Sequence, residues 1–240
     1  MEEVEYQVMA QVEDTHFWFV GTRGMVRDCL LAASLPPNPK ILDLGCGTGG
    51  TMKALAGLGD FVGLDMSEEA VRLATKRTGN PCVIGTADHI PFDDATFDAL
   101  LALDVFEHIP DDLAAVREAR RVLKMGGALI ATVPCHPWLF SEHDRALHHV
   151  RRYTRSGFLT LLGEASFRPQ RVTYTNTFLF PAVAMVRTFG RLRKKDSPAS
   201  DAQMRLGPLN GILSGIFQFE RRLLRHMNMP FGLSLHVLAR

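Results

Sequence analysis

The junction between an apolar run and a glycine-rich segment constrains the fold of this chain more than any other feature. The run 40–44 passes directly into residues 45–50, which read Gly-Cys-Gly-Thr-Gly-Gly. Glycines let a turn approach a ligand closely, because a side chain would collide with it and would oppose positive φ angles. Asp65 lies twenty residues beyond Gly45, where a carboxylate can accept both hydroxyls of a ribose. We therefore expect a strand, turn and helix that bind a nucleoside.

Short β-rich runs alternate with helical patterns through the middle of the chain. The runs cover 40–44, 60–65, 81–84, 97–103 and 128–133, and helical spacing occupies 51–57, 67–76 and 111–123. This alternation predicts a parallel sheet with helices on its faces. A further helix is expected over 156–165, and further strands over 170–177 and 233–238.

The length of 240 residues and the 46% hydrophobic content suit one large α/β domain that carries an insertion. We divide the chain into an N-terminal helical cap, 1–36, a nucleoside-binding domain, 37–177 with 233–240, and a helical insertion, 178–232. Within the insertion, the polar segment 194–202 is the expected linker.

Charge and cysteine content exclude several classes of protein. The chain has 27 Lys and Arg against 26 Asp and Glu, so no overall field attracts a nucleic acid, and none is expected as a partner. The four cysteines form no CxxC pair, which favours reduced thiols. The acidic start is unlike a signal peptide, and no apolar run approaches the roughly 18 residues of a membrane span. We expect a cytoplasmic protein.

The glycine spacing alone leaves two ligand classes open. Gly45, Gly47 and Gly50 also fit the pattern of dinucleotide-binding turns. Asp43, two residues before the first glycine, suits a ligand with a cationic amino group and would repel a pyrophosphate. An NAD(P)-dependent oxidoreductase or epimerase stays an alternative, although no tyrosine has a lysine four positions later. A catalytically inactive cofactor-binding scaffold is a second alternative.

Five motifs follow one another between positions 42 and 127. They are 42–49, 63–67, 87–92 with 97–98, 107–109 and 121–127. In these motifs the chain resembles the class I S-adenosylmethionine-dependent methyltransferases, particularly the group that includes ubiquinone and menaquinone biosynthesis enzymes. The resemblance implies a Rossmann-like three-layer αβα fold with a seven-stranded, mostly parallel sheet. Its last strand is antiparallel, and 233–238 is the expected place for it.

The resemblance also implies which residues bind S-adenosylmethionine. The glycine turn lines the methionine part, Asp43 lies near the amino group, and Asp65 holds the ribose. The adenine contacts are Met66, Asp88 and the backbone of His89, and Leu103 and Asp104 face the methyl group. The complete predicted cofactor-binding set is Phe19, Arg23, Asp43, Gly45, Cys46, Gly47, Gly49, Asp65, Met66, Asp88, His89, Leu103 and Asp104.

Phe19 and Arg23 enter this set because an aromatic cluster, 16–19, precedes the glycine turn. Such a cluster can be ordinary core. It can also form a lid, since aromatic faces attract a sulfonium and Arg23 can pair with the cofactor carboxylate.

The segment 138–154 follows the fifth strand, and ligands of open α/β folds bind beyond the carboxyl ends of strands. His143 or His148 with Asp144 can form an oriented base, because a carboxylate fixes the tautomer of an imidazole. His108, where the fourth strand ends, can also reach a substrate. The predicted catalytic residues are His108, His143, Asp144 and His148.

Arg151, Arg152 and Tyr153 are the predicted substrate-binding residues, because they can clamp a carboxylate or phosphate. Ordinary surface or core roles stay open for the whole segment. The histidine spacing lacks a matched pair with a distant third ligand, so we predict no metal site. In the resembling family Glu107 caps or packs, and a structural role is expected for it.

The insertion mixes apolar and basic residues at helical spacing. It can form a substrate lid, a dimer face, or a peripheral membrane contact through 178–225. The expected reaction is methyl transfer to an O, N or C atom of a small-molecule or lipid-linked acceptor. A homodimer and a location at the inner face of a membrane remain open.

Overall fold

The computed structural model describes residues 3–193, 207 and 209–240. The side chains of 3–5 and 188–193 are not described. The predicted linker, 194–202, lies outside the described residues.

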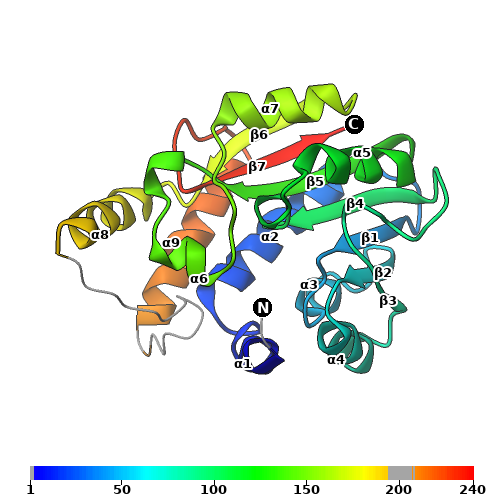
Figure 1. Ribbon diagram of the computed structural model, residues 1–240, viewed down its shortest axis with the longest axis horizontal. Coiled ribbons are helices and arrows are strands. Elements are labelled where there is room, and N and C mark those ends of the chain that lie inside the picture. Colours follow the sequence, from blue (N-terminus) through cyan, green and yellow to red (C-terminus); the bar gives the residue numbers. More distant parts are fainter. Residues whose placement is uncertain (1–2, 194–206, 208) are drawn as a thin grey trace.

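A seven-stranded sheet in the order β3-β2-β1-β4-β5-β7-β6 forms the centre of the protein (Figure 1). Every neighbouring pair is parallel except those of β7, which runs antiparallel to both β5 and β6. The predicted fold, with its antiparallel last strand, is confirmed. The strands are β1 Lys40–Leu44, β2 Asp60–Asp65, β3 Cys82–Ile84, β4 Phe97–Leu103, β5 Leu123–Pro134, β6 Pro169–Thr175 and β7 Ser234–Ala239.

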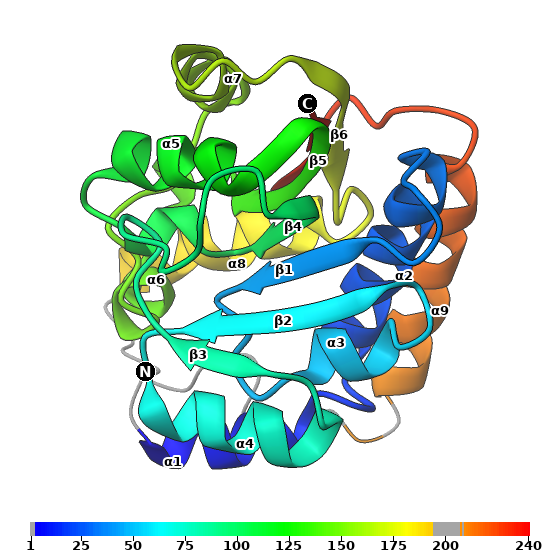
Figure 2. The ribbon, with the colours of Figure 1, turned by 90° about the vertical axis from the view of Figure 1, so that its right-hand side faces the viewer.

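Helices cover both faces of the sheet, as the alternating pattern predicts (Figure 2). Apolar side chains of α5 and α7 pack on one face, and those of α2, α3 and α4 pack on the other. The helices are α1 Glu3–Val12, α2 Phe17–Ala32, α3 Gly50–Ala54, α4 Glu68–Thr78, α5 Asp112–Val122, α6 Glu142–Ala146, α7 Arg155–Glu164, α8 Phe180–Arg193 and α9 Leu209–Leu224, with 3-10 turns η1 Phe106–His108 and η2 Pro137–Leu139.

Local capping explains where two of the core helices begin. The Ser67 hydroxyl accepts a hydrogen bond from the backbone N–H of Ala70 at 3.3 Å, and the Asp111 carboxylate accepts one from Ala114 at 3.0 Å. Both side chains satisfy N–H groups that the first helical turn leaves unpaired. The turns that these caps define place β2 and β4 so that their carboxyl ends open toward the same edge.

The helical insertion is attached to the core through α9. The ring of Phe217 packs directly against Gly21 of α2, and Arg221 forms a bidentate pair with Asp28 at 2.7 and 2.8 Å. Glu220 is buried and accepts backbone hydrogen bonds from Asn176 and Thr177 where β6 ends. These contacts fix α9 beside α2. Within the described part of the chain, no helix has the length and apolar character needed to cross a bilayer.

Candidate active site

The glycine turn after β1 has the left-handed conformation that its sequence predicts. The φ angles are +68° at Gly45, +52° at Gly47 and +79° at Gly49. Backbone N–H groups of Gly45 and Cys46 both donate to the carbonyl of Leu64, at 2.8 and 3.0 Å, which ties the turn to the end of β2. A side chain at Gly47 would meet the methyl group of Met9, from α1. The turn is therefore bare backbone at the carboxyl edge of the sheet.

Asp65 connects this turn to the next one. Its carboxylate accepts hydrogen bonds from the backbone N–H of Gly47 at 2.9 Å and of Ser67 at 3.0 Å. The hydroxyl of Tyr6 lies 3.5 Å from the same group, and burial raises the pKa of Tyr6 to about 12. Ser67 and Tyr6 both donate to Oδ1, whereas Oδ2 accepts from Gly47 alone, so a lone pair of Oδ2 is left for a ligand.

Asp43 is a buried carboxylate with an incomplete set of partners. Among the described residues, none bonds to its Oδ2 atom. Burial raises the pKa of Asp43 to about 7, and the charge of Arg23 opposes that shift. An isolated buried carboxylate is costly unless a cation completes it. The position beside the glycine turn therefore suits a ligand with an ammonium group.

Helix α1 and the start of α2 cover the turn, and their main polar contact was not predicted. Arg23 is buried and forms an ion pair with Glu13, whose carboxylate also accepts hydrogen bonds from Thr48 and Arg77. Arg23 was expected to hold a cofactor carboxylate; in this structure the carboxylate on it belongs to Glu13. A side chain at Gly50 would overlap this ion pair, so Glu13 lies at the N-terminus of α3, where anions bind well. Nothing in the sequence distinguishes Glu13 from other acidic residues near the start.

The remaining predicted cofactor residues lie around the turn at different depths. The Phe19 ring is half-buried, and its centre lies 5.6 Å from the guanidinium carbon of Arg23. Met66 is 75% exposed, and Leu103 packs partly buried beside the core. The backbone N–H of His89 bonds to the carbonyl of Thr86. The other predicted contacts keep these places: Cys46 is buried in the turn, Asp88 is exposed in the loop after β3, and Asp104 follows β4.

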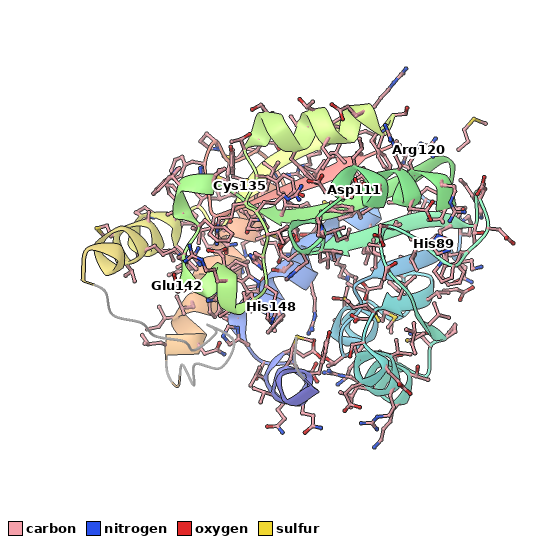
Figure 3. All side chains as sticks on the ribbon, viewed as in Figure 1. His89, Asp111, Arg120, Cys135, Glu142 and His148 are labelled. Carbon is pink, nitrogen blue, oxygen red and sulfur yellow. The ribbon has the colours of Figure 1, made fainter. Side chains whose placement is uncertain are left out.

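The side chain of His89 belongs to a different surface. It lines a hollow of about 600 Å³ together with Lys40 and Thr96, which lie at the amino-terminal ends of β1 and β4. Figure 3 shows His89 well apart from His148, which lies near α6. The side chains of His89 and His148 therefore belong to different parts of the surface.

Two carboxylates lie where β4 ends. Asp104 has a positive φ of 55°, and its Oδ1 atom accepts a hydrogen bond from the hydroxyl of Thr132 at 3.1 Å. Glu107, in η1, is fully buried, and neither of its carboxylate oxygens has a hydrogen-bond partner among the described residues. Burial and then the nearby Asp104 raise the pKa of Glu107 well above its ordinary value. Of the two expected roles, capping or packing, Glu107 packs inside the protein, with Nε2 of His149 4.0 Å from its Oε1 atom.

Asp144 orients a histidine, but not one of the two that were predicted. Its Oδ1 atom lies 3.2 Å from Nδ1 of His149, whereas His148 is exposed. The backbone at His148 is left-handed, with φ of 57°, and this bend turns His149 back toward Asp144. The predicted pairing of Asp144 with His143 or His148 is corrected accordingly: the bonded imidazole is that of His149. Sequence spacing could not reveal it, because the bend is a tertiary feature.

The three predicted substrate-clamping residues are engaged inside the protein. Arg152 is buried and donates to Asp144 at 2.7 Å and to the carbonyl of Cys135 at 3.0 Å. The hydroxyl of Tyr153 donates to the carboxylate of Asp112 at 2.8 Å, and Arg151 forms an ion pair with the same carboxylate. These contacts fix the loop 147–153 against η1 and α5. They correct the prediction that the three side chains project toward an acceptor.

Comparison with known proteins agrees with this geometry. The family described as a methyltransferase domain matches residues 42–131. Demethylmenaquinone methyltransferase of Staphylococcus aureus is 33% identical over 108 residues, which are 42% of this chain and 45% of that protein. Cycloartenol-C-24-methyltransferase 1 of rice is 31% identical over 122 residues, 47% of this chain and 34% of that protein. The chain thus matches less than half the length of each of these relatives.

A solved structure of S-adenosylmethionine-dependent methyltransferase from Methanosarcina mazei extends the likeness to the fold. It superposes with a TM-score of 0.58 over 87% of this chain and 95% of that one, at 17% sequence identity. The matched segment 42–131 contains the glycine turn, Asp65 and the end of β4. By its motifs and the family match, residues 42–131 form a methyltransferase domain, and the sheet has the fold of solved S-adenosylmethionine-dependent methyltransferases.

Proposed function

We propose that this protein transfers the methyl group of S-adenosylmethionine to an O, N or C atom of a small-molecule or lipid-linked acceptor. The observation that carries the proposal is Asp43, a buried carboxylate with an unpartnered oxygen beside a bare glycine turn. A ligand that brings its own ammonium group completes that carboxylate, whereas a pyrophosphate would be repelled by it. The oxidoreductase alternative is therefore not favoured.

The residues present fit the cofactor. The turn at Gly45, Gly47 and Gly49 would lie against the methionine part, with Asp43 at the ammonium group and Asp65 at the ribose hydroxyls. Arg23 would meet the cofactor carboxylate once Glu13, in the turn after α1, moves away. S-adenosylmethionine supplies a methyl group on a positively charged sulfur.

The protein contributes by aligning the two reactants and by excluding water from the site. Holding two reactants in line can be worth about 7–11 kcal/mol. The η1 turn and the ends of β1 and β4 form the wall on which an acceptor would lie, and α1 covers the turn through Met9. His149, whose Nδ1 atom is held by Asp144, is the side chain that we assign to activation of the acceptor.

The exposed apolar side chains of the insertion support a lipid-linked or membrane-bound acceptor as part of this proposal. They include Met185 and Val186 of α8 and Ile212 and Phe219 of α9, all more than half exposed. A face of this kind binds a membrane interface, an apolar acceptor or a second protein. Flotation with vesicles and gel filtration of the free protein separate these uses.

Calorimetric titration with S-adenosylmethionine tests the proposal. We expect micromolar binding, abolished by Asp65→Ala, which removes the ribose acceptor, and by Gly47→Val, which strains a left-handed residue beneath Met9. Asp60→Ala, at the exposed start of β2, and Gly163→Ala, at an open position of α7, are matched controls that keep binding. No heat at millimolar cofactor would end the proposal. Release of S-adenosylhomocysteine over a panel of acceptors distinguishes an enzyme from an inactive scaffold.

A further inference from the structure

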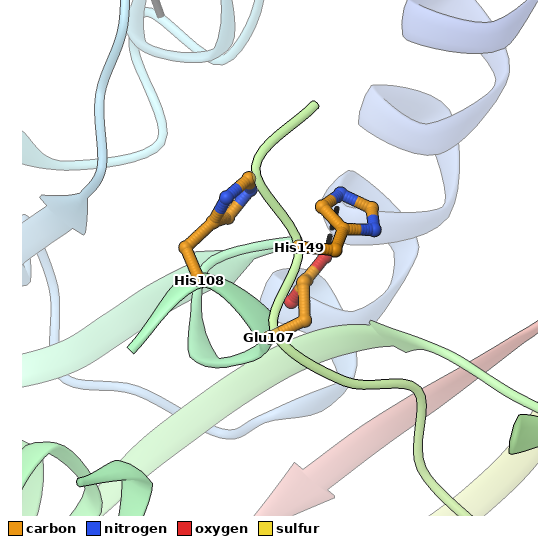
Figure 4. A group of neighbouring side chains, drawn as sticks. All are labelled: Glu107, His108 and His149. Atoms are coloured by element: carbon orange, nitrogen blue, oxygen red, sulfur yellow. Dashed lines mark ion pairs between the residues drawn. The ribbon is translucent and has the colours of Figure 1, made fainter. Parts of the chain in front are cut away.

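Three side chains with metal-binding atoms meet beside the glycine turn. Glu107 and His108 belong to η1, and His149 comes from the loop after α6 (Figure 4). One ligand atom from each lies within 4.8 Å of the others, and Nε2 of His149 is 4.0 Å from Oε1 of Glu107. The rings of His108 and His149 meet edge to face, 4.7 Å between centres. The sequence predicted no metal site because the histidine spacing within 138–154 lacks a matched pair with a distant third ligand.

The carboxylate of Glu107 is the group in this cluster that lacks a hydrogen-bond partner among the described residues. It is fully buried, and no described residue bonds to either carboxylate oxygen. A buried polar group without partners costs about 1–3 kcal/mol, and more when it is charged. A cation shared with the two imidazoles would satisfy this carboxylate, and nothing else among the described residues around it does so.

His149 is already oriented as a metal ligand. Asp144 accepts a hydrogen bond from Nδ1 of His149 over 3.2 Å. The other ring nitrogen, Nε2, then faces Glu107. Asp144 itself is fixed by Arg152 at 2.7 Å and by the backbone N–H of Ser141 at 2.8 Å. A histidine that ligates a metal usually gives its other ring N–H to such a carboxylate. A backbone hydrogen bond from Val150 to the carbonyl of Glu107, 2.8 Å long, holds the two segments together.

We propose that Glu107, His108 and His149 bind one divalent metal ion, with Asp144 as the positioning residue of His149. Two imidazoles and one carboxylate are the donor set of catalytic zinc sites and of ferrous sites with open positions. Metal–ligand bonds of about 2.0–2.2 Å put tetrahedral ligand atoms about 3.4 Å apart. The three groups, whose ligand atoms lie within 4.8 Å of one another, would therefore close in by on the order of an ångström. His108 has an exposed side chain and can make that movement.

The open positions of the ion give the site its use, and this step rests on the proposed methyl transfer. Val105, between Asp104 and η1, packs against Gly45, so the cluster lies next to the turn that would hold the methyl donor. A divalent ion lowers the pKa of a hydroxyl bound to it. We infer an acceptor with a hydroxyl group: its proton leaves to solvent, an O–C bond forms, and the methyl–sulfur bond breaks with its electron pair left on sulfur.

Cobalt(II) binding to untagged, EDTA-treated protein tests the site directly. We expect one Co²⁺ per chain, with the visible absorption of low-coordinate cobalt, and displacement by Zn²⁺. His149→Ala and Glu107→Gln should weaken binding by more than the about 10- to 100-fold that loss of an outer partner such as Asp144→Asn costs. His148→Asn, one position away, exposed and compatible with the left-handed φ of 57° at this position, is the matched control and keeps Co²⁺ binding.

Three outcomes would overturn the site: no stoichiometric Co²⁺ binding, equal losses in His148→Asn and His149→Ala, or full binding in Glu107→Gln. Because Glu107 is buried, His108→Gln serves as a second variant that does not disturb the core, and cooperative unfolding of each variant confirms its fold. Calorimetry with S-adenosylmethionine, with and without metal, separates the two proposals. Cofactor binding without Co²⁺ binding removes the metal site alone, and Co²⁺ binding without cofactor binding removes the methyl transfer alone.

Discussion

Asp43 links the stability of this protein to its proposed ligand. The unpartnered oxygen of Asp43 is the reason that the site favours a cation. Burial of this carboxylate also makes its ionised form unfavourable in the folded protein. Residues of this kind are retained where a function needs them, because an amide or apolar group would fold better. Its effects on folding and on binding should therefore have opposite signs.

The pH dependence of unfolding tests this statement. The pKa of Asp43 is raised from 3.8 to about 7 in the folded protein, so the folded state binds its proton more tightly over that interval. The free energy of unfolding then decreases as pH rises through it, by up to about 1.4 kcal/mol per pH unit. Asp43→Asn lacks this loss. In urea unfolding from pH 4 to 8, the free energy of unfolding of Asp43→Asn should rise relative to that of the natural protein until about pH 7. A difference between the two proteins that does not change with pH would contradict this prediction.

For single residues, the sequence predicted which residue types form the glycine turn, but not which side chains Arg23 and Asp144 contact. Asp65 and the glycines could be identified because a positive φ and a short turn require particular residue types. The partners of Arg23 and Asp144 could not, because Glu13 and His149 reach them only through the packing of α1 and the left-handed bend at His148.

Among the elements, α1 has the most direct bearing on ligand entry. Its C-terminal end places Glu13 on Arg23, Thr48 and Arg77, and its middle places Met9 over Gly47. A ligand carboxylate and Glu13 would compete for the same guanidinium. The helix is therefore a closed cover that has to shift before the turn can be used.

Glu13→Gln should open this cover. Without its charge the pair with Arg23 and Arg77 weakens, and the affinity for S-adenosylmethionine should rise about tenfold, or about 1.4 kcal/mol. Glu142→Gln, an exposed carboxylate paired with Arg145 in α6, is the control with little effect. Isothermal titration compares the two variants with the natural protein. Unchanged or weaker binding in Glu13→Gln would show that Glu13 supports the site instead of blocking it.

The elements themselves were largely predictable. The bounds of β1, β2 and β4 match the predicted runs, because buried parallel strands are continuous apolar stretches bounded by turns. β5 begins at Leu123 and not at 128, because Leu123 pairs with Phe97 across an irregularity in the ladder. That extension includes Lys124, Met125 and two glycines, whose composition favours a turn.

Over the whole molecule, β7 joins the sheet to the helices behind it. His236 of β7 is buried, and its Nε2 atom lies 3.2 Å from the sulfur of Cys29 in α2. Burial lowers the pKa of His236 from 6.5 to about 4. Protonation of this ring therefore opposes the complete fold, because a charged imidazole cannot stay in the place that the sheet gives it.

Acid unfolding should reveal this group. Between pH 6.5 and about 4 the unfolded chain binds the proton and the folded chain does not, so stability is lost as pH falls through that window. His236→Gln should lose less stability there than the natural protein, and His226→Gln, at an exposed position, should behave like the natural protein. Thermal unfolding at stepwise lower pH provides the measurement. Parallel losses in all three proteins would mean that other groups govern the acid limit.

The position of β7 between β5 and β6 also has a consequence for refolding from denaturant. Leu129 of β5 has its partner at Ala239, so this pairing forms only after the chain between them, which includes α6, α7, β6, α8 and α9, has folded or moved aside. Until then β5 presents a free row of backbone donors and acceptors, on which a neighbouring molecule can add a strand. Yield should therefore fall steeply with protein concentration, and the aggregates should be rich in intermolecular β-structure.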